Sequence, residues 1–152
     1  HILERMILLD WMILMEGKIL KKENIKLLVV HCSDTPDDEN LTPFDIHKLH
    51  LSFGWDGIGY HKIITKKGEI ENGRPEYWVG AHVYGKNHLS LGVCLIGRKI
   101  FNFKQLSALE TVLREWKKKY PLAIIKGHKD AIQTHKTCPN FDIDGWCKKK
   151  GL

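Results

Sequence analysis

The chain has 152 residues, of which 43% are hydrophobic and 28% are charged. These values are ordinary for a soluble protein with one domain and one core. A chain of this size and apolar content does not need disulfides, so its four cysteines fit a reducing cytosol better than a disulfide scaffold. An ordinary membrane span needs about eighteen consecutive apolar residues, and no such uncharged run occurs.

The formal net charge of +6 favours an anionic partner: nucleic acid, an acidic membrane surface or an anionic cell-wall polymer. The lysine runs at 117–119 and 148–150 do not alternate with aromatic residues, as a groove for single-stranded nucleic acid would. No nucleic-acid partner is therefore expected, and a solvated basic surface is the simpler interpretation.

The N-terminal segment Ile2 to Met15 is dense in large apolar residues and is interrupted by Glu4, Arg5 and Asp10. It lacks the uncharged centre and the small-residue cleavage site of a signal peptide. The pattern predicts a helix with a wide apolar face that docks on the domain or on another subunit, so self-association through this helix is one alternative. The expected division is residues 1–25 for this helix and its connection, and residues 26–152 for the main domain.

The first half of the main domain reads as a strand, a helix and a hairpin. Residues 26–31 predict a buried strand, because Leu27 to Val30 form a continuous apolar run, and His31 stands at its end. Thr42 is a helix cap followed by proline, and the helix is expected to stop at Gly54. Residues 60–65 predict a second strand, and a turn at 66–69 begins its return.

The second half adds a strand at 91–97, a helix at 103–120, a strand at 123–128 and a short helix near 143–150. The long helix has apolar residues at three- and four-residue steps and ends before Pro121. Alternating strands and helices predict one α/β domain with a central mixed β-sheet flanked by helices, plus the extra N-terminal apolar helix.

Two predicted strands end in histidine, at His31 and His128, and Cys138 follows on a loop. If the strands are neighbours, the two imidazoles meet at one sheet edge and the loop can fold back over it. Imidazole and thiolate are good zinc ligands, and a set of three leaves a fourth position free for catalysis. A lone histidine or cysteine is more often a packing residue, and this spacing lacks a short metal motif.

Six short blocks add to this pattern by occurring in an order that one enzyme family also has. Each block is modest alone, but the series is specific, and it spans roughly residues 26–146. The blocks are Val29 to Thr35, Gly59 to Ile64, Gly80 to His82, Asn87 to Gly97, Gly127 to Asp130 and Lys136 to Asp142.

In these blocks the chain resembles the zinc-dependent N-acetylmuramoyl-L-alanine amidases of the phage-lysozyme and peptidoglycan-recognition-protein family (type 2 amidases). The resemblance implies a peptidoglycan-recognition-protein-like fold. It also implies one catalytic Zn²⁺ ion and hydrolysis of the amide bond between N-acetylmuramic acid and L-alanine in peptidoglycan. Carried over by position, the zinc ligands are His31, His128 and Cys138, and the catalytic residues are Tyr60 and Lys136. Substrate-contacting positions are His82, Thr35, Trp78 and Asn87.

Outside the site, His61 is expected to point away from it, and His47, His50, His88 and His135 are expected at the surface. Cys32, Cys94 and Cys147 are interpreted as structural, with a free surface thiol at Cys147 as an alternative.

The expected role is that of a phage or prophage endolysin, synthesised in the cytoplasm and acting on the bacterial cell wall, with no clear signal peptide. Three alternatives remain open. They are a peptidoglycan-binding module without catalysis, a phage regulator that also inhibits RNA polymerase, and a structural zinc site. The last normally uses four protein ligands.

Overall fold

The computed structural model describes residues 18–152 as one α/β domain built on a five-stranded sheet in the order β3-β2-β4-β1-β5. β1, β2, β4 and β5 run parallel to one another, and the edge strand β3 is antiparallel to β2, so the sheet is mixed as predicted. The elements are η1 (Lys22–Asn24), β1 (Leu27–Cys32), α2 (Pro43–Ser52), β2 (Lys62–Ile64), β3 (Ile70–Asn72), η2 (Asn87–Leu89), β4 (Ser90–Leu95), α3 (Phe103–Lys119), β5 (Ile124–Gly127), α4 (His128–Ala131) and α5 (Ile143–Lys150).

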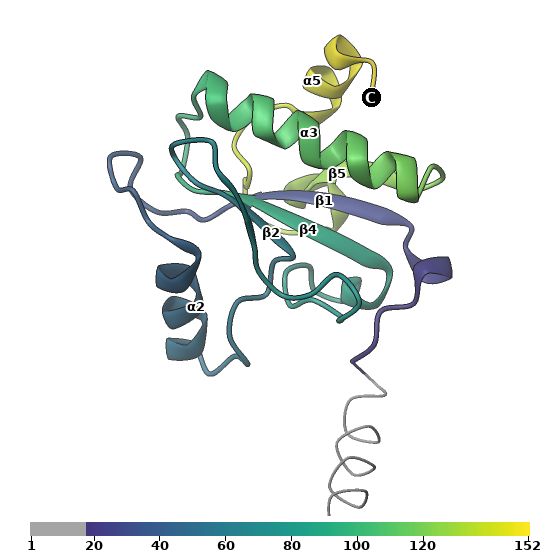
Figure 1. Ribbon diagram of the computed structural model, residues 1–152, viewed down its shortest axis with the longest axis horizontal. Coiled ribbons are helices and arrows are strands. Elements are labelled where there is room, and N and C mark those ends of the chain that lie inside the picture. Colours follow the sequence, from purple (N-terminus) through teal and green to yellow (C-terminus); the bar gives the residue numbers. More distant parts are fainter. Residues whose placement is uncertain (1–17) are drawn as a thin grey trace, which may run out of the picture.

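The main core lies between the sheet and α3, which crosses one face of it (Figure 1). Leu28 and Val30 of β1 belong to the same buried cluster as Leu109, Leu113 and Trp116 of α3. Side chains alternate along a strand, so Val29 and His31 point to the opposite face. That alternation directs the histidine at the end of β1 away from the core.

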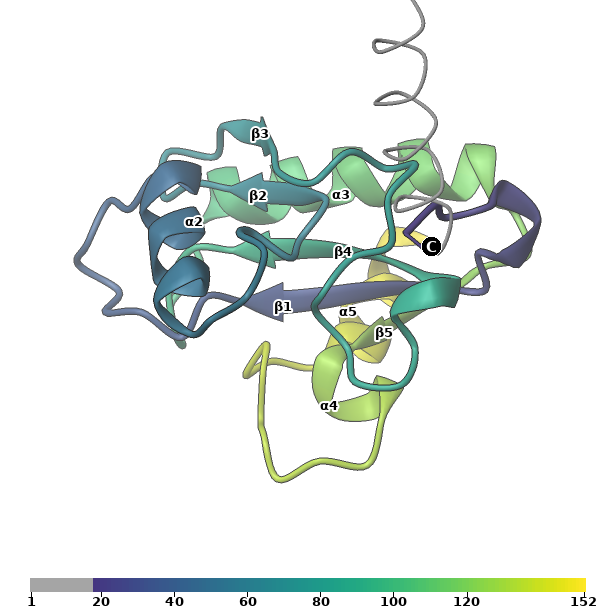
Figure 2. The same cartoon turned by 90° about the horizontal axis from the view of Figure 1, so that it is seen from below.

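The opposite face carries α2, α4 and the loops between strands (Figure 2). α2 packs there through a small cluster of Ile46, Ile63 and Ile96. The predicted cap is present, because Thr42 accepts from the backbone N–H of Asp45 and the Asp45 carboxylate accepts from the N–H of Thr42. This arrangement satisfies two helix N–H groups that would otherwise lack partners.

Three predicted strands are shorter in the structure, and one of them, β4, ends at Leu95 rather than at Gly97. β2 starts at Lys62 rather than at Tyr60, so Tyr60 and His61 precede it. β5 ends at Gly127, and His128 begins the short helix α4. The hairpin, α3 and α5 are confirmed within a residue or two. The predicted N-terminal apolar helix lies outside the described residues.

Residues 18–25 pack onto the domain ahead of β1. Leu20 and Ile25 are buried in the main core, and the backbone N–H of Leu20 donates to the carbonyl of Tyr77 at 2.8 Å. Ile19 forms a bridge with Trp78. The connection that precedes β1 therefore contributes apolar surface to the same core.

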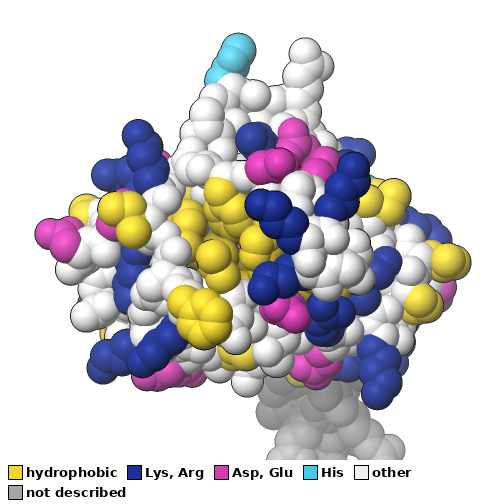
Figure 3. All heavy atoms as spheres, turned by 90° about the horizontal axis from the view of Figure 1, so that it is seen from above, with side chains coloured by type: hydrophobic (Ala, Val, Ile, Leu, Met, Phe, Trp, Pro, Cys, Tyr) yellow, Lys and Arg dark blue, Asp and Glu magenta, His cyan; other side chains and the backbone are white. Residues whose placement is uncertain are grey.

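Basic side chains surround an apolar area on the face that carries α3 and α5 (Figure 3). The last turn of α3 holds Lys117, Lys118 and Lys119, and that of α5 holds Lys148, Lys149 and Lys150. Lysines at helix C-termini are favoured by the helix dipole. Across residues 18–152, none of the helices has the length and apolar character needed to cross a membrane.

Candidate metal centre and active site

Two histidines and a cysteine meet at the end of β1. One ring nitrogen each of His31 and His128 and the Sγ atom of Cys138 lie within 4.8 Å of one another. The parallel register explains the first two, because Val30 lies opposite Gly127 and each of these residues is followed in the chain by a histidine. Their ring centroids are 4.6 Å apart. The predicted triad is therefore brought together by the pairing of β1 with β5.

The loop that follows α4 carries Cys138 back to the same edge. The backbone N–H of Lys129 donates to the carbonyl of Cys138 at 3.0 Å, which closes the loop on itself. The backbone N–H of Cys32 donates to the Cys138 Sγ at 2.9 Å. Such N–H groups favour a thiolate, the form in which cysteine binds metal.

The electrostatics of the three side chains suit a cation. Burial lowers the pKa of His31 well below its usual value, with further lowering by His82, His128 and Lys136. The imidazole is thus neutral, as a metal ligand must be. A hydrogen bond with the Cys32 thiol and burial raise the pKa of Cys138, so its ionisation requires a nearby positive charge. Two neutral imidazoles and a thiol of this kind form a donor set that fits zinc.

Tyr60 lies beside this cluster, with its ring centroid 5.0 Å from that of His31. Burial raises the pKa of the Tyr60 phenol well above its usual value, and the neighbouring Cys94, Cys138 and Cys32 add to the rise. The hydroxyl therefore remains protonated and can donate a hydrogen bond toward the cluster.

Lys136 is exposed on the loop between α4 and Cys138. Its positive charge contributes to the lowered pKa values of His31 and His128. The ammonium group therefore acts electrostatically on the cluster from the solvent side.

His82 lies behind His31. Only 9% of His82 is exposed, and its Nδ1 is 2.8 Å from His31 Nε2. Asn87 holds this loop in place, since its Oδ1 accepts from the backbone N–H groups of both His82 and Val83 at 2.9 Å. The assignment of His82 and Asn87 to substrate contact stays a prediction.

Thr35 and Trp78 occupy two other loops. Thr35 is 8% exposed, and its hydroxyl is 2.6 Å from that of Ser33. Trp78 is half-buried, and its carbonyl accepts from His61 Nε2 at 2.8 Å. Their roles in substrate contact also stay predictions.

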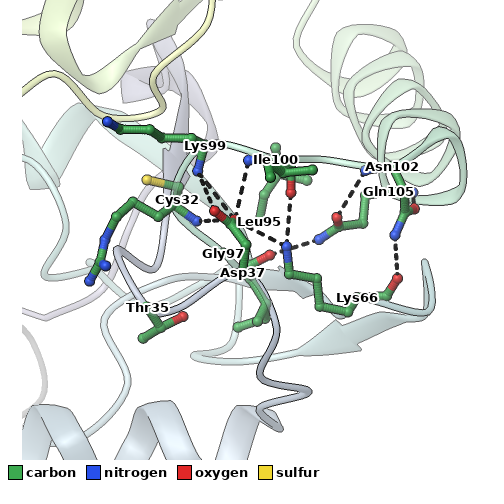
Figure 4. Close-up of polar contacts among 12 residues, drawn as sticks. Cys32, Thr35, Asp37, Lys66, Leu95, Gly97, Lys99, Ile100, Asn102 and Gln105 are labelled. Atoms are coloured by element: carbon green, nitrogen blue, oxygen red, sulfur yellow. Dashed lines mark hydrogen bonds and ion pairs between the residues drawn. The ribbon is translucent and has the colours of Figure 1, made fainter.

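An ionic anchor fixes the loop that carries Thr35. The Asp37 carboxylate accepts from the backbone N–H groups of Arg98, Lys99 and Ile100 and from Lys66 Nζ (Figure 4). These hydrogen bonds hold the pKa of Asp37 well below its usual value, and the one from the backbone of Arg98 has the largest effect. The loop after β1 is thereby tied to the loop after β4.

Two histidines that were predicted to lie outside the site, His50 and His61, are buried near it. His50 is 4% exposed rather than at the surface, and its ring centroid lies 5.3 Å from that of Tyr60. Its Nδ1 accepts from the N–H of Gly59, which explains its burial inside a turn. His61 is 1% exposed and stacks edge-on to His82. Of these two histidines, only His61 could have been connected with the site from the sequence, because it adjoins Tyr60.

The alternative of a surface thiol at Cys147 is wrong, because α5 buries that residue against the core.

Comparison with known proteins agrees with this geometry. The chain is 38% identical over 136 residues to the endolysin of Enterobacteria phage K11, a match that covers 84% of this chain and 89% of that protein. Among solved structures, the amidase LysC from Clostridium intestinale URNW superposes with a TM-score of 0.75 at 34% identity, over 85% of this chain and 87% of the other. Bumblebee PGRP-SA superposes with a TM-score of 0.74 at 26% identity, over 86% and 84% of the two chains.

The sequence profile of one family covers most of the described domain. It matches residues 21–141 and is described as N-acetylmuramoyl-L-alanine amidase. The match spans β1 through the loop that carries Cys138, and so contains every member of the His31, His128 and Cys138 cluster. This chain belongs to the N-acetylmuramoyl-L-alanine amidase family.

Proposed function

We propose that the chain is a zinc-dependent endolysin that hydrolyses the amide bond between N-acetylmuramic acid and L-alanine in peptidoglycan. The observation that carries the zinc assignment is the approach of His31, His128 and Cys138 to within 4.8 Å of one another. Three protein ligands are the number that catalytic zinc sites use. The role in lysis is supported by the likeness to the K11 phage endolysin over 84% of this chain and 89% of that protein.

His31 and His128 would hold the metal through ring nitrogens and Cys138 through its thiolate. When bound there, zinc supplies Lewis-acid polarisation of the substrate carbonyl and lowers the pKa of water. The backbone N–H of Cys32 stabilises the thiolate by its 2.9 Å hydrogen bond. A pair of buried neutral imidazoles and one thiolate leaves the site with a net positive charge once the ion is bound.

Lys136 supplies an exposed cation on the loop that carries Cys138. During amide hydrolysis, negative charge develops on the carbonyl oxygen, and a cation aimed at that oxygen stabilises the transition state. The loop position of Lys136 lets the ammonium reach a substrate that approaches from solvent.

Tyr60 supplies a protonated hydroxyl on a ring that packs beside His31. That hydroxyl can orient the attacking water or the substrate, or pass a proton to the departing amine of L-alanine. Its position at the start of the β2 hairpin is held by the backbone, because the Tyr60 carbonyl accepts from the N–H of Arg74 at 2.8 Å.

The proposal places synthesis in the cytoplasm and the substrate in the bacterial cell wall. Peptidoglycan is the expected partner. Self-association through the N-terminal segment and inhibition of RNA polymerase stay predictions, and a transcription assay with purified protein tests the latter.

Digestion of purified sacculi tests the reaction and the metal together. The protein is assayed as purified, after treatment with a chelator, and after Zn²⁺ is restored, and the new termini are identified by mass spectrometry. The expected products are free stem peptides that begin with L-alanine, released only when zinc is present. Cys138→Ala should lose both zinc and activity.

Cys147→Ala is the matched control, because the Cys147 thiol is also buried but lies on α5 in the main core, outside the cluster. Full hydrolysis by metal-free protein would contradict the zinc assignment. Binding to sacculi without release of stem peptide would favour a non-catalytic binding module.

A further inference from the structure

A buried line of hydrogen bonds runs from His31 to a backbone carbonyl. His31 Nε2 lies 2.8 Å from His82 Nδ1, and His82 Nε2 lies 3.2 Å from the hydroxyl of Ser90. That hydroxyl in turn lies 2.8 Å from the carbonyl oxygen of Lys86. His31, His82 and Ser90 are 1%, 9% and 0% exposed, so water does not compete for these groups.

The carbonyl at the end of the line sets the direction of every bond in it. A carbonyl oxygen only accepts, so the Ser90 hydroxyl donates to Lys86. The hydroxyl has one proton, so it accepts from His82 and the proton of that ring lies on Nε2. His82 Nδ1 is then bare and accepts from His31 Nε2–H. The nitrogen of His31 left without a proton is Nδ1.

We propose that His82 is a positioning residue that holds His31 in the Nε2–H tautomer, so that Nδ1 is the nitrogen presented to the metal. Ser90 and the carbonyl of Lys86 fix the orientation of His82 in turn. This role rests on the proposed function, because it assumes that His31 is a zinc ligand. Hydrogen bonds to the second nitrogen of a ligating histidine fix its tautomer and ring orientation and raise its basicity.

The His82 ring packs against two glycines, Gly92 and Gly80, and a larger residue at either position would collide with it. A Cβ atom at Gly92 of β4 would lie 2.5 Å from His82 Nδ1, and one at Gly80 would lie 2.7 Å from His82 Cδ2. Both distances are shorter than real contacts of this kind, so a side chain at either position would displace the ring. With the backbone of His82 held by Asn87, ring and backbone are both fixed.

His61 offers a matched control. It is a histidine as buried as His31, and its ring centroid is 5.7 Å from that of His82. Its own ring nitrogens bond to backbone groups, Nε2 to the carbonyl of Trp78 and Nδ1 to the N–H of Gly92. Replacing His61 therefore removes a buried imidazole of similar size while the bond between His82 and His31 remains.

The test compares His82→Ala with His61→Ala in two measurements. Long-range proton–nitrogen NMR of the metal-free protein reports the tautomer of His31. Competition with a chromogenic chelator gives the Kd for Zn²⁺. Wild type and His61→Ala should show His31 protonated at Nε2 and the same Kd. His82→Ala should show mixed tautomers and a Kd weakened about 10- to 100-fold.

Circular dichroism checks the fold of each variant. If His82→Ala does not fold, Ser90→Ala tests the same proposal. Ser90→Ala keeps the His82 ring but removes the hydroxyl that accepts from its Nε2, so mixed His31 tautomers and weaker zinc binding are again expected. A folded variant with wild-type tautomer and wild-type Kd would overturn the role of His82 alone. A wild-type protein that binds no zinc would overturn the proposed function as well.

Discussion

The backbone N–H of Cys32 donates to the Sγ atom of Cys138 at 2.9 Å and so joins two residues that are 106 positions apart in the chain. Cys32 is the last residue of β1, and Cys138 lies on the loop that follows α4. The bond brings the thiol to the strand end where His31 already lies. It also stabilises the thiolate that a metal requires. The end of β1 thus carries one proposed ligand and helps to orient a second.

Removal of the Lys136 charge should slow the reaction without loss of metal. Lys136→Met is expected to lower kcat by about 100-fold or more, the size of effect seen when one group that stabilises an oxyanion is removed. The zinc content should stay at one per chain, because Lys136 is not in the cluster. Kinetics on soluble muropeptides together with metal analysis check this. Lys129→Met, at an exposed lysine on α4, is the control and should retain activity.

The hydroxyl of Tyr60 should matter more than its ring. Tyr60→Phe keeps the ring that packs 5.0 Å from His31 and should lower kcat by about 100-fold, as expected for loss of a group that transfers or orients a proton. Because the pKa of Tyr60 is raised by burial, ionisation of the phenol should not reduce wild-type activity below about pH 10. Steady-state kinetics across pH test both statements, and a Tyr60→Phe enzyme with wild-type kcat would remove Tyr60 from the mechanism.

Acid should weaken the metal-free fold through His61. Burial lowers the pKa of His61 from 6.5 to about 4. The unfolded chain therefore binds the proton first, so this stability is complete above about pH 6.5 and is lost as pH falls toward 4. The difference corresponds to a loss on the order of 3 kcal/mol. Urea unfolding at pH 7 and pH 5 should detect about 2 kcal/mol of this loss, because pH 5 still lies above the folded pKa of His61.

His61→Ala should show a flatter dependence of unfolding free energy on pH than wild type over the same interval. Equal slopes for the two proteins would mean that His61 does not stay neutral in the folded state.

The Asp37 carboxylate should stabilise the loops on either side of it. Asp37→Asn should lower the urea midpoint at pH 7, because an amide replaces the charge that accepts from Arg98, Lys99, Ile100 and Lys66. The folded pKa of Asp37 is depressed, so its contribution is present above about pH 4 and is lost as pH falls further. The two proteins should therefore converge in acid.

Asp38→Asn is the control for that comparison, since Asp38 is exposed on the same loop. A difference between wild type and Asp37→Asn that stays constant from pH 7 to pH 3 would contradict an ionic anchor.

Local sequence patterns predicted most of the elements. The apolar run before His31 predicted β1, the helical repeat of apolar residues predicted α3, and the turn at 66–69 predicted the hairpin of β2 and β3. Strand ends were less well predicted. Tyr60 and His61 have strand-like side chains, but they precede β2, and their carbonyls accept from the N–H groups of Arg74 and Gly73 in the loop after β3. The three candidate ligands were found because histidines stand at two strand ends and a cysteine follows on a nearby loop.

The sequence by itself determined the set of chemical groups: two imidazoles, one thiol, one phenol and one ammonium. Only the tertiary structure decided which of them meet and in what state. The order β4-β1-β5 places His31 beside His128, and the loop over β4 places His82 behind His31. Periodicity reports which face of its own element a residue occupies. The neighbours across strands and loops, and the hydrogen bonds that set a tautomer, depend on how distant segments pack.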